Sequence, residues 1–176
     1  RCIAGLEQPT RGEIYLGKRC VFSDAQQINV NAKDRGVGLA FQNYALYPHM
    51  TVFKNIAFGL RTRGYRRGVI EQRVRETLRI VELEGFEDRY PHQLSGGQQQ
   101  RVAVARMIAP KPNFLLFDEP LSNLDPKLRV SVRAYLKDLH TKIGATSIYV
   151  THDQREAIQI SNRIAVMGHG EIVQIG

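Results

Sequence analysis

No stretch of the sequence is long and apolar enough for a membrane span. A transmembrane helix needs roughly 18 or more consecutive apolar residues, and no run in this sequence approaches that length. Residues 1–5, RCIAG, lack the layout of a signal peptide, and there are no internal repeats, low-complexity tracts or heptads. We therefore expect one globular domain without a membrane-spanning helix.

Cysteine is scarce. The two cysteines, Cys2 and Cys20, stand far apart and have no metal-ligand spacing. This argues against a cysteine-based metal centre, and it favours the reduced thiols of a cytosolic protein over a disulfide scaffold.

Acidic residues are outnumbered: 17 Asp and Glu face 25 Lys and Arg, and the net charge is +8. Such an excess suits nucleic acid or an anionic membrane surface, and composition does not choose between them. The densest basic run, residues 61–67, contains only one aromatic residue. A solvated loop fits this run better than a nucleic-acid patch, so we expect no nucleic-acid partner.

The hydrophobic periodicity predicts three parts: a β-rich start, a helical middle, and a final part that alternates strands and helices. The predicted strands are residues 13–16, 37–41, 114–117, 147–150 and 163–167, and the predicted helices are residues 51–61, 69–84, 95–109, 126–143 and 153–160. The alternation in the final part predicts a parallel α/β sheet, with active groups at the carboxyl ends of its strands.

Polar side chains follow two of these strands directly. Asp118 and Glu119 come after residues 114–117, and His152 comes after residues 147–150. In a nucleotide hydrolase the first carboxylate would hold Mg²⁺, the second would orient or deprotonate water, and the histidine would contact a γ-phosphate. Taken alone, however, an acidic strand end or a histidine is more often structural.

The third predicted helix opens with residues 94–98, LSGGQ. Two glycines allow close backbone approach, Ser95 can cap the helix, and the free N–H groups and dipole of a helix start attract phosphate. The glycines alone could be an ordinary turn into a helix. Joined to residues 99–103, QQRVA, and to the acidic pair downstream, the string is highly specific.

Residues 94–98 resemble the signature motif of ABC ATPases. The other motifs follow the family's order: residues 114–120 resemble its Walker B strand, residues 122–125 its D-loop, residues 151–153 its switch histidine, and Gln42 its Q-loop glutamine. The resemblance covers nearly the whole chain. It implies a P-loop NTPase-like (RecA-like) parallel sheet core, an inserted α-helical subdomain and an antiparallel β portion near the N-terminus.

The resemblance also implies a division of residues 1–176 as one partial nucleotide-binding domain. Residues 1–43 would form the β-rich and Q-loop part, residues 44–110 the helical subdomain, and residues 111–176 the core with Walker B, D-loop and switch histidine.

The resemblance also implies roles in binding and hydrolysing ATP with Mg²⁺ for four residues. Glu119 would be the general base, His152 would contact the γ-phosphate, and Asp118 would support Mg²⁺. Gln42 would help to coordinate Mg²⁺ and the attacking water, and would sense the membrane partner.

A second group of residues would act across a dimer interface. In this family Ser95, Gly96, Gly97 and Gln98 close over nucleotide held by the opposite protomer, and Asp125 contributes across the same interface. Two paired subunits would therefore sandwich two ATP molecules.

Residues 12–18, GEIYLGK, have the spacing of a phosphate-binding loop. Arg19 nevertheless stands where a hydroxyl residue should ligate Mg²⁺, and the intervening residues have a strand pattern, so we expect a hairpin. Residues 1–6 instead resemble the end of the helix that follows the true loop in this family. We expect the sequence to start after the Walker A segment, and the chain alone to be inactive.

Residues 43–52, NYALYPHMTV, resemble the segment after the Q-loop in importer ATPases of the maltose, multiple-sugar and glycerol-phosphate type. This implies an ATP-hydrolysing subunit that powers uptake of a sugar or polyol. It would lie peripherally on the cytoplasmic face of the cell membrane, as a homodimer or paired with another ATPase subunit. Its further partners would be two transmembrane permeases and, indirectly, an extracytoplasmic solute-binding protein.

Three alternatives remain open. Polyamine and ferric-ion importers share much of the pattern. An ABC ATPase of DNA repair or chromosome organisation would usually carry a coiled-coil or zinc insertion, and none lies between Gln42 and Ser95. A catalytically silent subunit has no support from the surviving positions, because Glu119 and His152 are both present.

Overall fold

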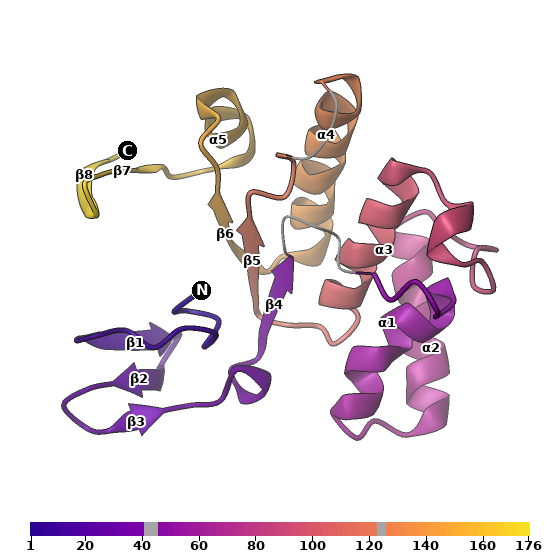
Figure 1. Cartoon of the computed structure of the whole chain (residues 1–176), viewed down its shortest axis with the longest axis horizontal. Coiled ribbons are helices and arrows are strands. Elements are labelled where there is room, and N and C mark those ends of the chain that lie inside the picture. The colour runs from indigo at the N-terminus through magenta and orange to yellow at the C-terminus, as the bar shows by residue number, and fades with distance from the viewer. Residues whose placement is uncertain (41–45, 123–125) are drawn as a thin grey trace.

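A three-stranded parallel sheet lies at the centre of the computed structural model, which describes residues 1–40, 46–122 and 126–176, and only the backbone of 126–128 (Figure 1). Its strand order is β4 (Val37–Ala40), β5 (Phe114–Asp118), β6 (Thr146–Val150). All pairs are parallel, with Leu115 opposite both Gly38 and Ser147. The interior of β5 is buried, as expected for a strand with neighbours on both sides. The predicted parallel α/β core is confirmed.

Two helices connect and flank the later strands. Helix α4 (Pro126–Ile143) joins β5 to β6, and Val132, Leu136 and Leu139 along it are buried in the same core as β5. Their spacing places them on one helical face, which is the stripe that the sequence predicts. Helix α5 (Gln154–Ile160) follows β6, and the side chain of Asp153 caps it by accepting from the N–H groups of Arg155 and Glu156.

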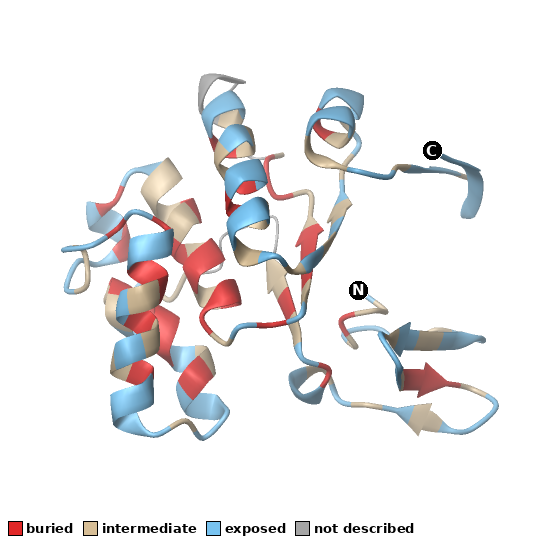
Figure 2. Ribbon diagram, turned by 180° about the vertical axis from the view of Figure 1, so that it is seen from behind, coloured by how far each residue is buried: buried red, intermediate tan, exposed pale blue. Residues whose placement is uncertain are grey.

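Three helices form the helical part of the molecule, to the right in Figure 1. They are α1 (Val52–Thr62), α2 (Arg67–Ile80) and α3 (Gly96–Ile108), with a short 3₁₀ turn, η2 (Pro91–Gln93), before α3. Their inward faces are buried (Figure 2). Helix α3 also packs against β4: a Cβ atom on Gly38 would lie 2.6 Å from Cγ of Met107. Only glycine allows this approach of helix and sheet.

Helix α2 ends earlier than the sequence predicts. The prediction placed its end at residue 84, before Gly85, whereas the chain leaves the helix at Glu82, whose φ is 55°. The N–H of Leu83 donates to the carbonyl of Leu78 at 2.9 Å, and the N–H of Glu82 donates to the carbonyl of Arg79 at 3.2 Å. These are the bonds of a Schellman motif. Leu83 and Leu78 are both buried, so their apolar contact accounts for a left-handed residue that is not glycine.

The N-terminal strands are antiparallel: β1 (Glu13–Leu16), β2 (Arg19–Ser23) and β3 (Ile28–Asn29), followed by a 3₁₀ turn, η1 (Ala32–Asp34). Leu16 pairs with Arg19 across a two-residue turn in which Gly17 has a φ of 62°. The segment with phosphate-loop spacing is therefore a hairpin, as predicted. The sequence did not reveal β2 and β3 as separate strands.

The predicted strand at residues 163–167 does not extend the parallel sheet. In the described residues, β7 (Ala165–Gly168) pairs antiparallel with β8 (Glu171–Ile175), which was not predicted. The reason lies in the turn: His169 has a φ of 51° and Gly170 of 85°, and two left-handed residues favour a tight hairpin. Both strands are largely exposed (Figure 2).

The first residues have the hydrogen bonds of a helix C-terminus. The N–H of Leu6 donates to the carbonyl of Arg1 and the N–H of Gly5 to that of Cys2, and Gly5 has a φ of 77°. The Arg35 guanidinium, 3% exposed, donates to the carbonyl oxygens of Cys2 at 2.8 Å and Ile3 at 3.1 Å. Burial lowers the pKa of Arg35. A cation at this position offsets the carbonyl groups that a helix end leaves unpaired.

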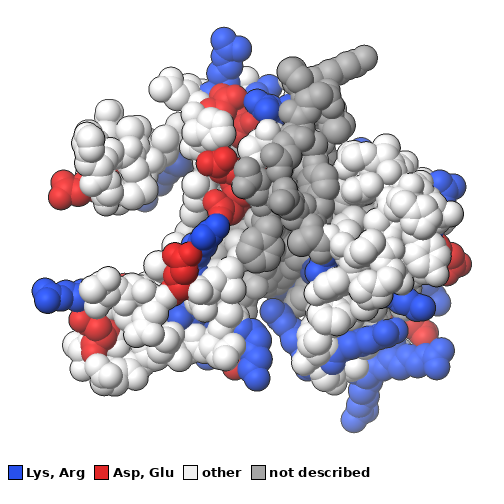
Figure 3. All heavy atoms as spheres, viewed as in Figure 1, with Lys and Arg blue, Asp and Glu red and all other residues white. Residues whose placement is uncertain are grey.

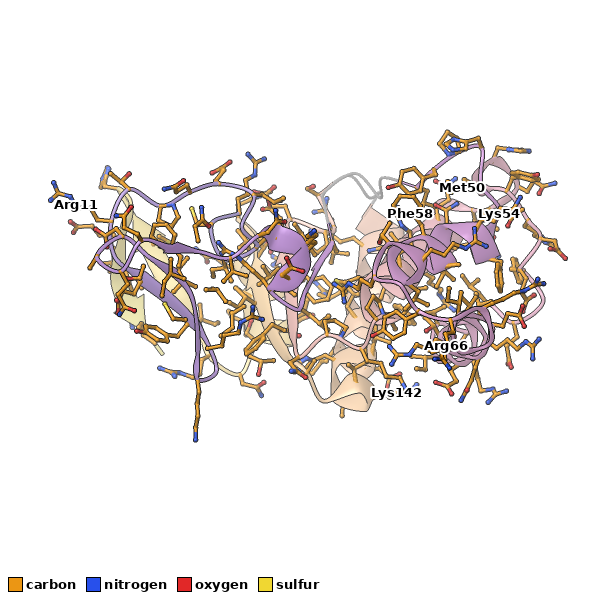
Figure 4. The ribbon with its side chains drawn as sticks, turned by 90° about the horizontal axis from the view of Figure 1, so that it is seen from below. Arg11, Met50, Lys54, Phe58, Arg66 and Lys142 are labelled. Atoms are coloured by element: carbon orange, nitrogen blue, oxygen red, sulfur yellow. The ribbon has the colours of Figure 1, made fainter. Side chains whose placement is uncertain are left out.

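Basic side chains are spread over the molecule rather than gathered in one stripe. In Figure 4 Arg11 lies at one end of the long axis, Arg66 in the helical part and Lys142 at the end of α4. Lys142 contacts Asp138 at 2.6 Å, and Arg67 contacts Glu71 at 2.9 Å. Figure 3 likewise shows Lys and Arg at several separate places on one face. Among the described helices, none combines the length and apolar character that crossing a membrane requires.

Candidate active site at the carboxyl edge of the sheet

Strands β5 and β6 end side by side. Asp118 pairs with Val150 in the parallel register, and the N–H of Glu119 donates to the carbonyl of Val150 at 3.0 Å. The residues that follow the two strands therefore leave the sheet at neighbouring points. This is the arrangement that the sequence predicts if β5 and β6 are neighbours.

Glu119 has a strained backbone. Its φ is 45°, a left-handed conformation that is uncommon for a residue other than glycine. The turn is held by Ser122, whose N–H and Oγ donate to the carbonyl of Glu119 at 3.2 and 3.0 Å. Strain of this kind is concentrated at functional sites, where the surrounding structure fixes one side-chain direction. The sequence analysis did not anticipate it, because no glycine or asparagine marks the position.

The side chains of Glu119 and His152 meet. Oε2 of Glu119 lies 3.2 Å from Nδ1 of His152, and the two side chains are 35% and 72% exposed. Because both remain accessible, a substrate can reach them. A carboxylate and an imidazole in contact at a strand edge can together accept, hold and donate a proton.

A small cavity adjoins this pair. Its lining includes Glu119, Ser122, Thr151, His152 and Glu156, and its volume is about 10 Å³. That volume is at the lower limit for one water molecule. The site therefore has space for a reacting water but not for a nucleotide, which would have to lie outside it.

Asp118 provides a second carboxylate at the edge. It is 41% exposed at its side chain, and its Oδ2 lies 3.9 Å from Nε of Arg1. The described residues contain no group of three His, Cys, Asp or Glu side chains that could enclose a metal ion. Mg²⁺ does not require such a cage, because it keeps several waters and is commonly held by one or two carboxylates and substrate phosphates. The pair Asp118 and Glu119 fits that chemistry.

The signature residues form a separate group at the start of α3. Ser95 is the N-cap: its Oγ accepts from the N–H of Gln98 at 3.3 Å, and Oε1 of Gln98 accepts from the N–H of Ser95 at 2.9 Å. Gly96 and Gly97 occupy the first two helical positions, where N–H groups have no partner within the helix.

The structure does not bring this group to the strand edge. None of the residues 94–98 lines the cavity at Glu119, and Ser95 and Gly96 are exposed. The two predicted groups therefore lie apart within one chain. Gln42 and Asp125, the remaining predicted site residues, lie outside the described residues.

No role was predicted for Glu156, and Thr151 was predicted only as a member of the motif at residues 151–153. Glu156 is 3% exposed and accepts hydrogen bonds from Tyr149 and Thr151 beside His152. The available signal was weak: Tyr149 and Thr151 alternate along β6, and Glu156 follows the capping Asp153 by three residues.

Comparison with known proteins gives the family. The ABC transporter family model matches residues 1–122. The trehalose/maltose import ATP-binding protein MalK of Thermococcus litoralis is 54% identical over all 176 residues. The sn-glycerol-3-phosphate import ATP-binding protein UgpC of Yersinia pseudotuberculosis is 52% identical over the same span. This chain belongs to the ABC transporter family, and the resemblance to importer ATPases is confirmed.

The match covers the whole of this chain but 47% and 48% of those two relatives. The chain thus spans about half the length of the curated relatives it matches. Among solved structures, a dimeric post-hydrolysis state of an ATP-binding cassette bound to ADP and Pi superimposes with a TM-score of 0.75. Its sequence is 33% identical, and the alignment covers 99% of this chain and 77% of that one. The predicted fold class is confirmed.

Proposed function

We propose that the full-length protein hydrolyses ATP, and that the strand edge described above is where the reaction occurs. The observation that carries this proposal is the contact between Glu119 and His152, 3.2 Å apart at the ends of adjacent parallel strands in an ABC family member. Glu119 accepts the proton of the attacking water, and its strained backbone fixes the direction of the carboxylate. His152 donates a hydrogen bond to the γ-phosphate.

Asp118, together with Gln42, would hold Mg²⁺, and the ion would offset the negative charge of the phosphates. Within this chain, Asp118 faces a cation, Arg1, at 3.9 Å. Gln42 retains the role that the sequence predicts, in contact with both the ion and the attacking water.

The start of α3 serves as a second half-site. The free N–H groups of Gly96 and Gly97, with the positive end of the helix dipole, can bind a nucleotide's phosphate. Since these residues lie apart from Glu119 in one chain, we infer that they act on nucleotide held by a second protomer, together with Ser95, Gln98 and Asp125. The dimeric state of the solved neighbour supports this arrangement.

The relatives' names favour import of a sugar or a phosphorylated polyol. We accordingly propose that ATP hydrolysis drives uptake through two transmembrane permeases supplied by an extracytoplasmic solute-binding protein. The protein would lie on the cytoplasmic face of the membrane. The three-part division of the domain, at residues 1–43, 44–110 and 111–176, belongs to the same proposal.

The variant Glu119→Gln tests the reaction. In the full-length protein it should lower ATP turnover about 10²- to 10⁴-fold, because the base is lost while the side-chain shape is kept. ATP binding should persist, and the closed dimer should accumulate in size-exclusion chromatography with ATP. Glu171→Gln, at an exposed residue of β8, is the matched control and should be unaffected. Normal turnover in Glu119→Gln would contradict the proposed site.

A further inference from the structure

Glu156 is a buried carboxylate that the proposed reaction does not use. It is 3% exposed, whereas Gln154 and Arg155 before it on α5 are exposed. Arg129 lines the same cavity as Glu156. Two hydroxyl groups bond to the carboxylate: Oε2 of Glu156 accepts from Tyr149 at 3.1 Å and from Thr151 at 2.9 Å. A buried charge is costly to keep, so its hydrogen bonds call for a specific explanation.

Hydrogen bonds link Glu156 to the residues immediately before and after His152. Thr151, before the histidine, donates to the Glu156 carboxylate, and its Oγ1 accepts from the N–H of Asp153, after the histidine, at 3.0 Å. Oδ1 of Asp153 in turn accepts from the N–H of Glu156 at 3.3 Å. The backbone on each side of His152 is therefore tied to Glu156, through its carboxylate on one side and its N–H on the other, and these bonds fix the direction in which the Cα–Cβ bond of His152 points.

The imidazole itself has little other support. Its side chain is 72% exposed, and Oε2 of Glu119 is the contact that the structure gives it among the described residues. An exposed ring on a free strand end would sample several rotamers. The backbone turn from Thr151 to Asp153 directs the Cα–Cβ bond of His152, and the contact with Glu119 then selects among the rotamers that this direction allows.

Of the two hydroxyl donors, Tyr149 lies in β6 and Thr151 follows its last residue directly. Tyr149 and Thr151 alternate with Ile148 and Val150, which are 41% and 51% exposed on the other face. Burial raises the pKa of Tyr149, and the charge of Glu156 raises it further. The phenol therefore keeps its proton and remains a donor to the carboxylate.

We propose that Glu156 is a positioning residue for the hydrolysis reaction: through Thr151 and Asp153 it holds the His152 imidazole beside Glu119. The inference rests on the proposed function, because it assumes that His152 acts on the γ-phosphate. Glu156 lines the small cavity beside Glu119, but the nucleotide would lie outside that cavity, so Glu156 does not touch the nucleotide. Its removal should therefore reduce the rate of the chemical step and leave nucleotide binding nearly unchanged.

The test uses the full-length protein in its assembly with the permeases. Glu156→Ala and Thr151→Val should each lower kcat for ATP about 10- to 100-fold, the usual effect of a misplaced catalytic group, with KM changed less than about twofold. Glu156→Gln keeps an acceptor oxygen and Thr151→Ser keeps the hydroxyl, so both should retain kcat within about threefold. Tyr149→Phe is the matched control, because it removes one hydroxyl bond to the same oxygen at a residue not adjacent to His152.

The same substitutions in a His152→Ala background separate positioning from stability. Glu156→Ala should cause no further loss there, since no imidazole is left to position. If Glu156→Ala lowers kcat further in the His152→Ala background, the inference is overturned. It is also overturned if Tyr149→Phe lowers kcat as much as Thr151→Val does. Wild-type turnover in His152→Ala would instead contradict the proposed role of the histidine itself. A strong effect of His152→Ala with a normal Glu156→Ala would overturn the positioning role alone.

Discussion

The strand edge and the start of α3 are built in different ways. At the edge, functional side chains touch each other: Glu119 meets His152 at 3.2 Å on a backbone held at a φ of 45°. At the start of α3, Ser95 and Gln98 bond back to their own helix, and what remains for a ligand is backbone N–H groups. In the proposed function, one half-site offers acid–base chemistry and the other offers a phosphate cradle, and neither contains what the other provides.

This difference explains why a single copy of the chain would be incomplete. Helix α3 packs on β4 through Met107 and Gly38, which holds the helix against the sheet. It cannot fold over onto Glu119 without losing that contact. A second protomer can bring an α3 start to each strand edge without any such loss. Changes to each half-site should therefore have different effects, which the following variants distinguish.

Ser95→Arg should have the largest effect. A bulky cation at the exposed helix start blocks the half-site that its own protomer offers to the partner, so with the substitution in both protomers ATP turnover by the full-length protein should fall at least about 100-fold, as when a catalytic group is misplaced. ATP binding to the monomer should remain, measured by equilibrium titration. Ser95→Ala removes the N-cap without adding bulk, and it should cost only about 1 kcal/mol of helix stability. If the Ser95→Arg protein still dimerises when ATP is added, the two half-sites do not differ in the way described.

Met107→Ala tests the rigid link between the half-sites. Met107 is 5% exposed, and losing its side chain against Gly38 should cost about 2–5 kcal/mol. Hydrogen exchange in the full-length protein should show the loss in the amides of α3 and β4, and not in those of β1 and β2. Val150→Ala, at a position 51% exposed, is the control. If hydrogen exchange in α3 is unchanged, the packing of Met107 against Gly38 is not what links α3 to β4.

Glu119→Gly should have the smallest effect on stability, and in the opposite direction. Glycine adopts a φ of 45° without strain, so the local opening free energy should rise by about 1 kcal/mol, at the lower end of such strain, while hydrolysis is lost. Glu119→Gln keeps the strain and should not stabilise. Hydrogen exchange at the end of β5 measures the difference. Equal protection in the two variants would show that the turn stores no strain.

The sequence predicted best those elements whose signals are local. Helices α1 and α3 begin within a residue of the predicted positions because Thr51 and Ser95 cap them. The predicted end of α2 was wrong because the left-handed residue is Glu82 rather than a glycine. The buried Leu83 accounts for this conformation through packing, which is not a local signal. The pairing of β7 was wrong because the His169–Gly170 turn was not recognised.

The same distinction holds at the site. Asp118, Glu119 and His152 were identified as following strands, and the structure places them at one edge. The strain at Glu119 and the burial of Glu156 could not be predicted, because both depend on contacts between segments. The separation of residues 94–98 from the edge is likewise a property of the tertiary structure.

The most direct test of two half-sites acting in trans is a comparison of two mixed dimers of the full-length protein. The first pairs a Glu119→Gln protomer with a Ser95→Arg protomer; the second pairs a wild-type protomer with one that carries both substitutions. If the half-sites join across the interface, the first dimer keeps one intact site and shows single-turnover hydrolysis, whereas the second keeps none. Activity in the second dimer and none in the first would mean that each chain completes its own site, contrary to this account.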